Sequence, residues 1–288
     1  MKENPSFNRL RLLTGDGVVK RLHATRVIIF GIGGVGSWCA EALARSGVGT
    51  ITLVDSDLIC RTNINRQVQA TLASIGMVKV KELAARLLAI NPEMAVEARQ
   101  EIYQRGSADT FQLAGYDYVI DAIDSLSAKV DLIISATEAG ATVYTALGAS
   151  CKIDPTRIRI APLWESQGCH LGKLVRKRLR RRKFSGTPLC VYSEELLPVR
   201  ETESGLGCGS GSCICPKVVV SGTDDDEDAL IHEWCSKKKQ INGSAVHITG
   251  TYGFFMAGMV LQDVVRREES SEEKKTDDVS ASGGEISE

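Results

Sequence analysis

The sequence predicts an α/β fold with a doubly wound, mainly parallel, Rossmann-like sheet. Three observations indicate this fold: short apolar runs alternate with amphipathic segments, a glycine-rich turn follows the first apolar run, and an aspartate ends the second. Strands that alternate with helices form parallel sheets, because each helix carries the chain back to the start of the next strand. The 288 residues suffice for one large domain or two small ones.

Buried strands and amphipathic helices alternate through the first half of the chain. The strands are short runs rich in Val, Ile and Leu, expected at residues 26–31, 50–54, 116–120 and 142–146. The helices space their apolar residues three or four apart, and we expect them at residues 10–23, 34–46, 78–90 and 129–139. Gly47 and Asn91-Pro92 mark the ends of two of these helices. We assign residues 1–150 to one core domain.

The pattern changes after residue 150, and we assign residues 151–267 to a C-terminal extension. Its expected elements are strands at residues 157–161 and 190–192, a basic helix between them, and a final core-packing helix at residues 248–266. Residues 201–243 are rich in Gly, Ser, Cys and Asp and predict a long crossover loop. Residues 268–288 are acidic and of low complexity, which predicts a disordered tail.

A glycine-rich loop follows the first strand, with Gly31, Gly33, Gly34 and Gly36 in sequence. Glycines permit the turn and bring the backbone close to a phosphate, which then lies at the N-terminus of the next helix. Asp55 ends the second strand and suits a contact with a ribose hydroxyl. Both NAD and ATP sites use these features, so they predict a nucleoside phosphate without choosing between them. A structural turn without a ligand is the alternative.

The stretch that follows separates the two nucleotides. Asn63, Asn65, Arg66 and Gln67 combine an arginine fork with carboxamides, which suits further phosphate oxygens or a leaving pyrophosphate. A dehydrogenase has little use for such a group, whereas an enzyme that makes acyl-adenylates needs one. Lys79 opens the next helix and would add a point charge to the same pocket, unless it is a solvated lysine on the helix surface.

Two carboxylates stand at the carboxyl end of the third strand, where open α/β sheets bind their ligands. Of these, Asp124 could hold Mg²⁺ together with phosphate oxygens, and Ser125 adds a hydroxyl beside it; the other is Asp121. The alternative for Asp124 is an N-cap of the following helix. The chain has no G-x-x-x-x-G-K-[ST] motif, so the set predicts an ATP and magnesium site outside the P-loop class.

The motifs GIGGVGS, VDSD, NINRQ and DAIDS, with Lys79, resemble those of the ubiquitin-activating-enzyme-like (ThiF/MoeB/HesA-type) adenylating superfamily. The resemblance implies that ATP and Mg²⁺ are bound, and the leaving pyrophosphate stabilised, by Asp55, Asn65, Arg66, Lys79 and Asp124. The usual motif ends in Asp-Asn, whereas Ser125 follows Asp124 here. The resemblance also implies a homodimer in which an N-terminal arginine of the partner reaches the nucleotide, and Arg11 is our candidate.

Within the superfamily, the chain most resembles the tRNA threonylcarbamoyladenosine dehydratase branch. The segments that carry this resemblance are GGVGSW, EALARSG, TNINRQ, YVIDAIDS, KIDPTRI and CVYSEE, and the paired CxxC motifs of other branches are missing. It implies that ATP activates the threonylcarbamoyl carboxylate on tRNA and that internal attack closes a ring with loss of one water. The alternatives are an activating enzyme for a small sulfur-carrier protein, an NAD-dependent oxidoreductase, and a nucleotide-sensing module without catalysis.

The net charge of −1 hides a strongly basic segment with eight cations in eleven residues. These candidate tRNA-binding residues are Lys173, Arg176, Lys177, Arg178, Arg180, Arg181, Arg182 and Lys183. Such a cluster on one helix suits a phosphate backbone. A solvated charged helix without a partner is the alternative, and a protein-tail substrate would not need the cluster.

The cysteines carry the least information. Cys208, Cys213, Cys215 and Cys235 could supply four thiolates to zinc, although their spacing is not that of a standard zinc knuckle. A single catalytic thiol among them is the alternative, and sulfurtransferase proteins are among the partners left open. No signal peptide and no apolar run of membrane-spanning length are visible, so we expect a cytoplasmic protein that does not enter membranes.

Overall fold

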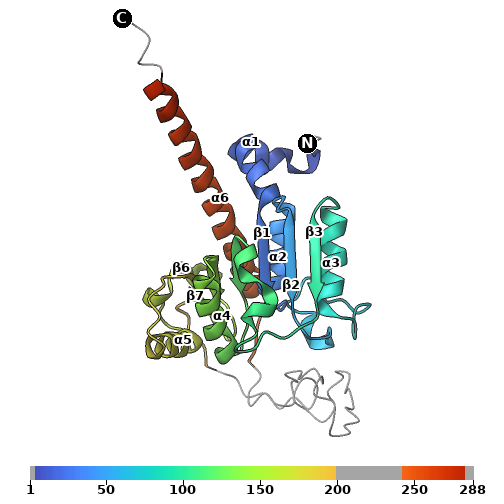
Figure 1. The fold of residues 1–288 in the computed structure, drawn as a ribbon. Coiled ribbons are helices and arrows are strands. Elements are labelled where there is room, and N and C mark those ends of the chain that lie inside the picture. Colours follow the sequence, from blue (N-terminus) through green and yellow to red (C-terminus); the bar gives the residue numbers. More distant parts are fainter. Residues whose placement is uncertain (1–3, 199–241, 283–288) are drawn as a thin grey trace, which may run out of the picture.

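The computed structural model describes residues 4–198 and 242–282. Its strands form one seven-stranded sheet in the order β3-β2-β1-β4-β5-β7-β6 (Figure 1). The strands, in chain order, are β1 Arg26–Phe30, β2 Thr50–Val54, β3 Ala95–Arg99, β4 Tyr118–Asp121, β5 Thr142–Ala146, β6 Ile158–Pro162 and β7 Leu189–Ser193. All pairs are parallel except β6 with β7, so the predicted α/β fold with a mainly parallel sheet is confirmed.

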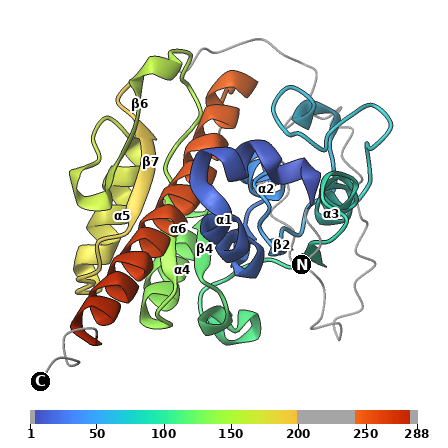
Figure 2. The same ribbon diagram turned by 90° about the horizontal axis from the view of Figure 1, so that it is seen from above.

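Helices cover both faces of the sheet. They are α1 Asn8–Ala24, α2 Gly36–Arg45, α3 Lys79–Ile90, α4 Leu126–Glu138, α5 His170–Arg181 and α6 Val246–Ser282. Because side chains alternate along a strand, β1 sends Val27 and Ile29 to one core and Ile28 and Phe30 to the other. The first core lies under α1, α2, α3 and α6, and the second under α4 and α5. Figure 2 shows α6 running diagonally beside α1.

The helices and strands expected from the sequence are present, with ends that mostly differ by a few residues. Strand β3 was not predicted: it joins the sheet at the edge beside β2, and its residues are exposed or half-buried. An edge strand pairs with a neighbouring strand on one side only, and its side chains are only partly covered. It can therefore contain Ala, Glu and Arg in place of a continuous apolar run. Strands β6 and β7 of the extension continue the same sheet.

The predicted crossover loop at residues 201–243 lies outside the described residues except for its last two positions. The four candidate zinc cysteines fall in the part that is not described, so their prediction is untested. Among the described residues, no group of three or more His, Cys, Asp or Glu could hold a metal ion. In the same residues, no helix is long and apolar enough to cross a membrane.

The tail differs from its prediction. Disorder was expected from residue 268 onward, whereas α6 continues to Ser282, and only residues 283–288 lie outside the described part. The Arg21 guanidinium of α1 lies 2.7 Å from the Glu268 carboxylate and donates to the Ser271 hydroxyl at 3.1 Å. These contacts attach the start of the acidic segment to the core, which composition alone does not reveal.

Candidate functional site

The glycine-rich loop connects β1 to α2 at the carboxyl ends of the parallel strands. Gly31 has a φ of +87°, and a side chain at Gly36 would overlap the Gly31 carbonyl oxygen, so both positions require glycine. A Cβ at Gly34 would press on Thr249 of α6. A Cβ at Gly33, by contrast, would have no atom within 4 Å. The loop therefore opens to solvent at Gly33, at the N-terminus of α2.

The loop is held in place by backbone and side-chain hydrogen bonds. Gly31 N donates to Val54 O at 2.9 Å, and Ile32 N donates to Asp55 Oδ2 at 2.7 Å. The Ile32 carbonyl accepts from Gln69 Nε2 at 3.0 Å. Asp55, predicted to contact a ribose, thus also shapes the loop. Gln69 is buried and was missed by the sequence reasoning, which stopped at Gln67.

Lys79 is buried at the start of α3 and faces two carboxylates. Its Nζ lies 2.7 Å from Asp57 Oδ2 and 3.8 Å from Asp55 Oδ1. The alternative of a solvated lysine is therefore wrong. Burial alone would lower the pKa of Lys79, but the charges of Asp55 and Asp57 outweigh it and raise the pKa. Burial raises the pKa of Asp55, which Lys79 opposes. The lysine consequently stays protonated beside the glycine loop.

The segment predicted to bind phosphate is divided by the structure into buried and outer residues. Asn63 is buried, and its Oδ1 accepts from Cys60 N at 2.9 Å, while Gln67 is buried beside Gln69. Asn63 therefore fixes the start of its own segment, and Gln67 contacts the glutamine that holds the glycine-rich loop. Asn65 and Arg66 lie further out, and Arg66 Nη1 donates to Asn65 Oδ1 at 3.0 Å.

Arg66 contacts α2 and lies near enough to Lys79 to affect its pKa. Its carbonyl oxygen accepts from Trp38 Nε1 of α2 at 3.0 Å. Its charge lowers the pKa of Lys79, a smaller effect than that of the two carboxylates. The two cations thus stand near each other, an arrangement that suits the several charges of a polyphosphate.

The two carboxylates after β4 have different environments. Asp121 is fully buried in an ion pair with Lys129 Nζ at 2.6 Å, and it also accepts from Thr145 Oγ1 at 2.6 Å and Ile123 N at 3.1 Å. Asp124 is exposed, and the N-cap of α4 is Ser125. The N-cap alternative for Asp124 is therefore wrong. Asp121 stabilises the strand end, and Asp124 is presented to solvent at the edge that carries the glycine loop.

Comparison with known proteins identifies the family of this chain. A family model described as the ThiF family matches residues 7–266. This chain belongs to the ThiF family. It is 35% identical to a tRNA threonylcarbamoyladenosine dehydratase of Haemophilus influenzae, an alignment that covers 89% of this chain and 92% of that protein. It is 32% identical to the Escherichia coli protein of the same name, with 91% and 94% covered.

Solved structures lead to the same branch of the ThiF family. The crystal structure of Escherichia coli tRNA N6-threonylcarbamoyladenosine dehydratase with AMP has a TM-score of 0.75 and 29% identity, and covers 92% of this chain and 96% of that one. The structure of that protein with ATP has a TM-score of 0.74 over the same shares. The predicted resemblance to the superfamily and to its dehydratase branch is confirmed.

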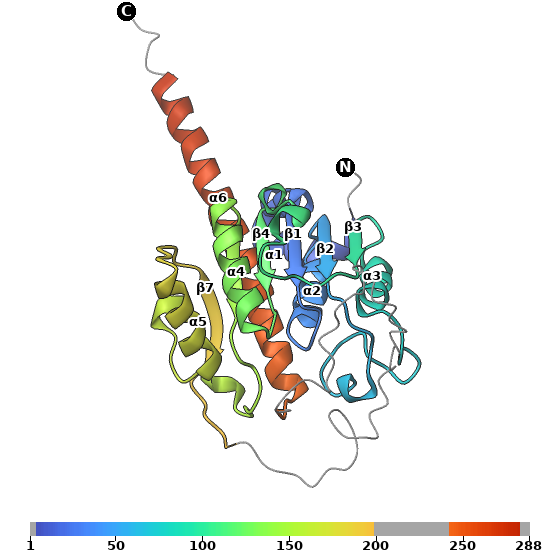
Figure 3. The same cartoon turned by 60° about the horizontal axis from the view of Figure 1, so that its bottom comes forward.

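The basic helix α5 of this ThiF-family chain uses its cations in two ways. Figure 3 shows α5 beside α4 and β7. One set, the anchoring cations, binds side chains outside α5: Arg176 with Ser166, Arg178 with Ser127 at 2.7 Å, and Arg182 with Asp131 at 3.3 Å. The other set, the outward cations, is exposed and consists of Lys173, Lys177, Arg181 and Lys183. Arg180 lies over the ring of Trp164.

Arg11, the candidate for the arginine of the partner subunit, lies on α1. It donates to Asn8 Oδ1 at 2.9 Å and lies 3.7 Å from the Asp16 carboxylate. Figure 1 places α1 at the amino-terminal edge of the sheet, the edge opposite the glycine loop. Arg11 therefore lies away from the glycine loop of its own chain, and its contact with the nucleotide of a second copy stays a prediction.

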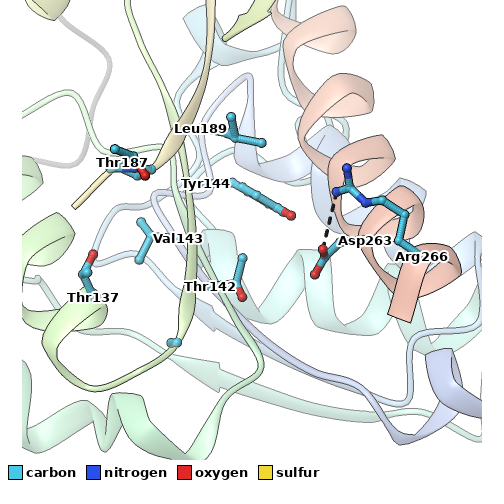
Figure 4. Close-up of a pocket in the computed structure, with 10 residues that line it drawn as sticks. Thr137, Thr142, Val143, Tyr144, Thr187, Leu189, Asp263 and Arg266 are labelled. Carbon is cyan, nitrogen blue, oxygen red and sulfur yellow. Dashed lines mark hydrogen bonds and ion pairs between the residues drawn. The ribbon is translucent and has the colours of Figure 1, made fainter. Parts of the chain in front are cut away.

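A cavity of about 340 Å³ lies away from all these residues, between β5, β7 and α6 (Figure 4). Tyr144, Asp263 and Arg266 line it, and Asp263 also accepts from the hydroxyl of Tyr118 at 2.8 Å. None of the residues predicted to bind nucleotide, metal or tRNA lines this cavity. The candidate nucleotide site is instead an open surface at the carboxyl ends of β1, β2 and β4.

Proposed function

We propose that this ThiF-family chain uses ATP to activate the carboxylate of threonylcarbamoyladenosine in tRNA and closes it to the cyclic form. The observation that supports this proposal most is that Lys79, Arg66 and the open N-terminus of α2 lie at one edge of the sheet, with Asp124 exposed in the loop after β4 at the same edge. The activity is the one named for relatives that cover nearly the whole chain, and its prediction from sequence is confirmed.

The chain's own residues divide the work of binding and charge stabilisation. The phosphates lie against the N–H groups of the glycine loop at Gly33. Lys79 and Arg66 stabilise the negative charge that grows as pyrophosphate leaves. Asp124 would hold Mg²⁺ with one carboxylate and phosphate oxygens, the donor set that magnesium prefers, and the ion would neutralise phosphate charge. Asp55 fixes the loop and reaches the ribose.

Two bond exchanges complete the reaction. A substrate carboxylate oxygen attacks the α-phosphorus of ATP, so a P–O bond to the acyl group forms and the bond to pyrophosphate breaks. A nucleophile within the threonylcarbamoyl group then attacks the acyl carbon, and AMP leaves with its bonding electron pair. The nucleoside loses the elements of one water, and ATP becomes AMP and pyrophosphate. The second step needs no cysteine and no protein nucleophile.

Homodimerisation of the ThiF-family chain is part of the proposal. Leu12 and Leu13 of α1 are 77% and 79% exposed, beside Arg11. Large apolar side chains grouped in this way favour burial against another protein. A second copy seated on α1 would cover them and could bring its Arg11 to the nucleotide.

We place the reaction in the cytoplasm. The cysteines of the described residues are free thiols: Cys39, Cys60, Cys151, Cys169 and Cys190. Free thiols without disulfides are typical of a reducing compartment.

The test is direct. The protein is incubated with ATP, Mg²⁺ and tRNA carrying threonylcarbamoyladenosine, the tRNA is digested, and the nucleosides are weighed by mass spectrometry. We expect loss of one water together with release of AMP and pyrophosphate. Pyrophosphate exchange that requires a carrier protein, with the nucleoside unchanged, would overturn the proposal.

Site variants refine the test. Arg66→Ala and Asp124→Ala should each lower turnover by about 10²–10³, the usual cost of removing one group that stabilises transition-state charge. Arg105→Ala and Asp109→Ala are matched controls, because both residues are exposed and neither is predicted to bind nucleotide or metal, and they should keep full turnover. Thermal unfolding of all four variants shows whether they remain folded.

A further inference from the structure

Two half-buried aromatic side chains lie beside the basic helix. The rings of Trp164 and Phe184 are 6.5 Å apart, and the Arg180 guanidinium lies 5.5 Å from the centre of the Trp164 ring. The Trp164 indole donates to Gly186 O at 2.8 Å, which fixes its orientation. We name this group of Trp164, Phe184 and Arg180 the aromatic ledge. It borders the outward cations, which lie on the same helix and its C-terminal turn.

Helix α5, which carries Arg180, contacts the start of α4, directly after the loop that contains Asp124. Arg178 donates to Ser127 Oγ at 2.7 Å, and Ser127 stands in the first turn of α4, three residues after Asp124. Val175 and Leu179 of α5 are buried in the same core as α4. An RNA bound along α5 therefore lies next to the loop that presents Asp124.

The chemistry of the substrate restricts the kind of RNA that can bind there. The threonylcarbamoyl group is attached to N6 of adenine, which is on the edge that pairs with another base. An enzyme that acts on a base needs it outside the helical stack, either in a single strand or flipped out. The nucleotides around the modified adenosine are consequently unpaired when the carboxylate reaches the nucleotide site.

We propose that the aromatic ledge and the outward cations together bind an unpaired strand of the tRNA. A base next to the modified adenosine stacks on the ledge, and the outward cations contact the phosphates that follow. This proposal rests on the proposed function and adds which part of the tRNA is recognised and by which residues. Stacking on aromatic rings or guanidinium planes beside a basic track is how proteins bind single strands.

Charge and shape both favour this occupant. Lys173, Lys177 and Arg181 recur every four residues, so they form one stripe along α5, with successive residues roughly 6 Å apart. Such a stripe neutralises a polyanion without reading its sequence. The ledge adds a contact that a duplex cannot satisfy, because its bases are stacked on one another.

The experiment compares two RNA probes on the full chain. One probe is a hairpin RNA with an unpaired loop, and the other is a blunt-ended duplex RNA of the same base composition. We expect Trp164→Ala to weaken hairpin binding by about 5- to 150-fold, the effect of losing one stacked base, and to leave duplex binding unchanged. Trp164→Phe keeps a ring and should retain most of the hairpin affinity. Fluorescence anisotropy at fixed salt measures the dissociation constant of each protein for each probe.

A second variant distinguishes a role of the aromatic ledge in RNA binding from a purely structural role of Trp164. Arg180→Gln removes the cation of the ledge from an exposed position, so it should weaken hairpin binding while the unfolding midpoint stays that of the wild type. Equal loss of hairpin and duplex binding in Trp164→Ala, or no loss of either, would show that the ledge only packs the turn after α5.

Turnover of modified tRNA by the wild type separates this failure from failure of the proposed function. An inactive wild type contradicts the activity. An active wild type whose Trp164→Ala variant binds the hairpin normally contradicts only the ledge.

Discussion

The edge of the sheet that carries the glycine-rich loop, Arg66 and Lys79 is called the nucleotide edge. This edge and the basic helix α5 both carry positive charge, but the surroundings of the charges are opposite. Lys79 is buried against two carboxylates at the start of α3, and one of these, Asp55, also accepts a hydrogen bond from Ile32 N of the glycine-rich loop. The outward cations of α5 are exposed, on a helix that the anchoring cations attach to the core. A small polyphosphate in one reactive geometry requires fixed charges, whereas a long polyanion is bound by many mobile ones. Variants should therefore affect turnover in the first region and salt-dependent affinity in the second.

The largest expected effect is at the buried ion pair below the nucleotide edge. Lys129→Met should lower the free energy of unfolding by about 3–5 kcal/mol, because it leaves the Asp121 carboxylate buried without its cation. Urea unfolding measures the change. Adding Asp121→Asn to Lys129→Met removes the uncompensated charge while keeping an acceptor for Thr145, so the double variant should recover much of the loss. A double variant no more stable than the single one would contradict this account.

Lys79→Met should sharpen the comparison at the nucleotide itself. We expect turnover to fall by about 10²–10³, since one fixed charge at the leaving pyrophosphate is lost. Lys81→Met is the matched control, because Lys81 is exposed on the same helix. The pKa of Lys79 is raised from 10.5, so its charge and its contribution to stability persist below that pH and are lost only as pH rises through the higher value. A wild-type activity profile that falls with a lysine titration below pH 10.5 would count against this assignment.

The basic helix provides the converse measurement. The triple variant Lys173→Ala, Lys177→Ala and Arg181→Ala should reduce the slope of log K for tRNA against log salt by about 2, at roughly 0.7 per phosphate contact. Its stability should stay close to that of the wild type. Replacing the anchoring cations with Ala should instead lower stability, because they bind Ser127, Ser166 and Asp131. If both sets change only the salt slope, the division between them is wrong.

The smallest effect concerns how the helices of the nucleotide edge are held together. Glu41 of α2 binds Arg86 of α3 at 2.6 Å and Arg45 at 2.7 Å. Burial would raise the pKa of Glu41, but these two arginines outweigh it and lower the pKa from 4.5. The stability from this carboxylate is present above pH 4.5 and is lost as pH falls through the lower value. Glu41→Gln should thus cost up to about 1 kcal/mol at neutral pH and nothing in acid. If Glu41→Gln lowers the stability equally in acid, Glu41 contributes through packing and not through its charge.

Much of the fold was readable from the sequence, because buried parallel strands are continuous apolar runs. The strand at residues 50–54 was predicted with the bounds that the structure has. Edge strand β3 was not predicted, because half-exposed residues need no apolar run. The helical tail was not predicted, because it is attached to the core by Arg21, which is far away in sequence. Local composition reports burial well and long-range contacts poorly.

The candidate site was predicted residue by residue but not in its division of roles. The motif order identified Arg66, Lys79 and Asp124, and the structure leaves these three near one edge. The sequence motifs could not show that Asp121 is paired with Lys129, since that contact depends on how α4 packs on the sheet. Gln69 likewise carries no motif signal, and its role follows only from its contact with the Ile32 carbonyl.

The peptide groups on both sides of Ile32 are held, the N–H by Asp55 and the carbonyl by Gln69. Ordering one backbone residue costs about 1–2 kcal/mol of conformational entropy, and in this loop folding has already met that cost. Nucleotide association therefore begins from a preorganised surface. The same rigidity has a consequence at the end of the cycle. A loop that does not relax when pyrophosphate departs offers AMP the same surface as ATP, so product release must come from the phosphate contacts that AMP lacks.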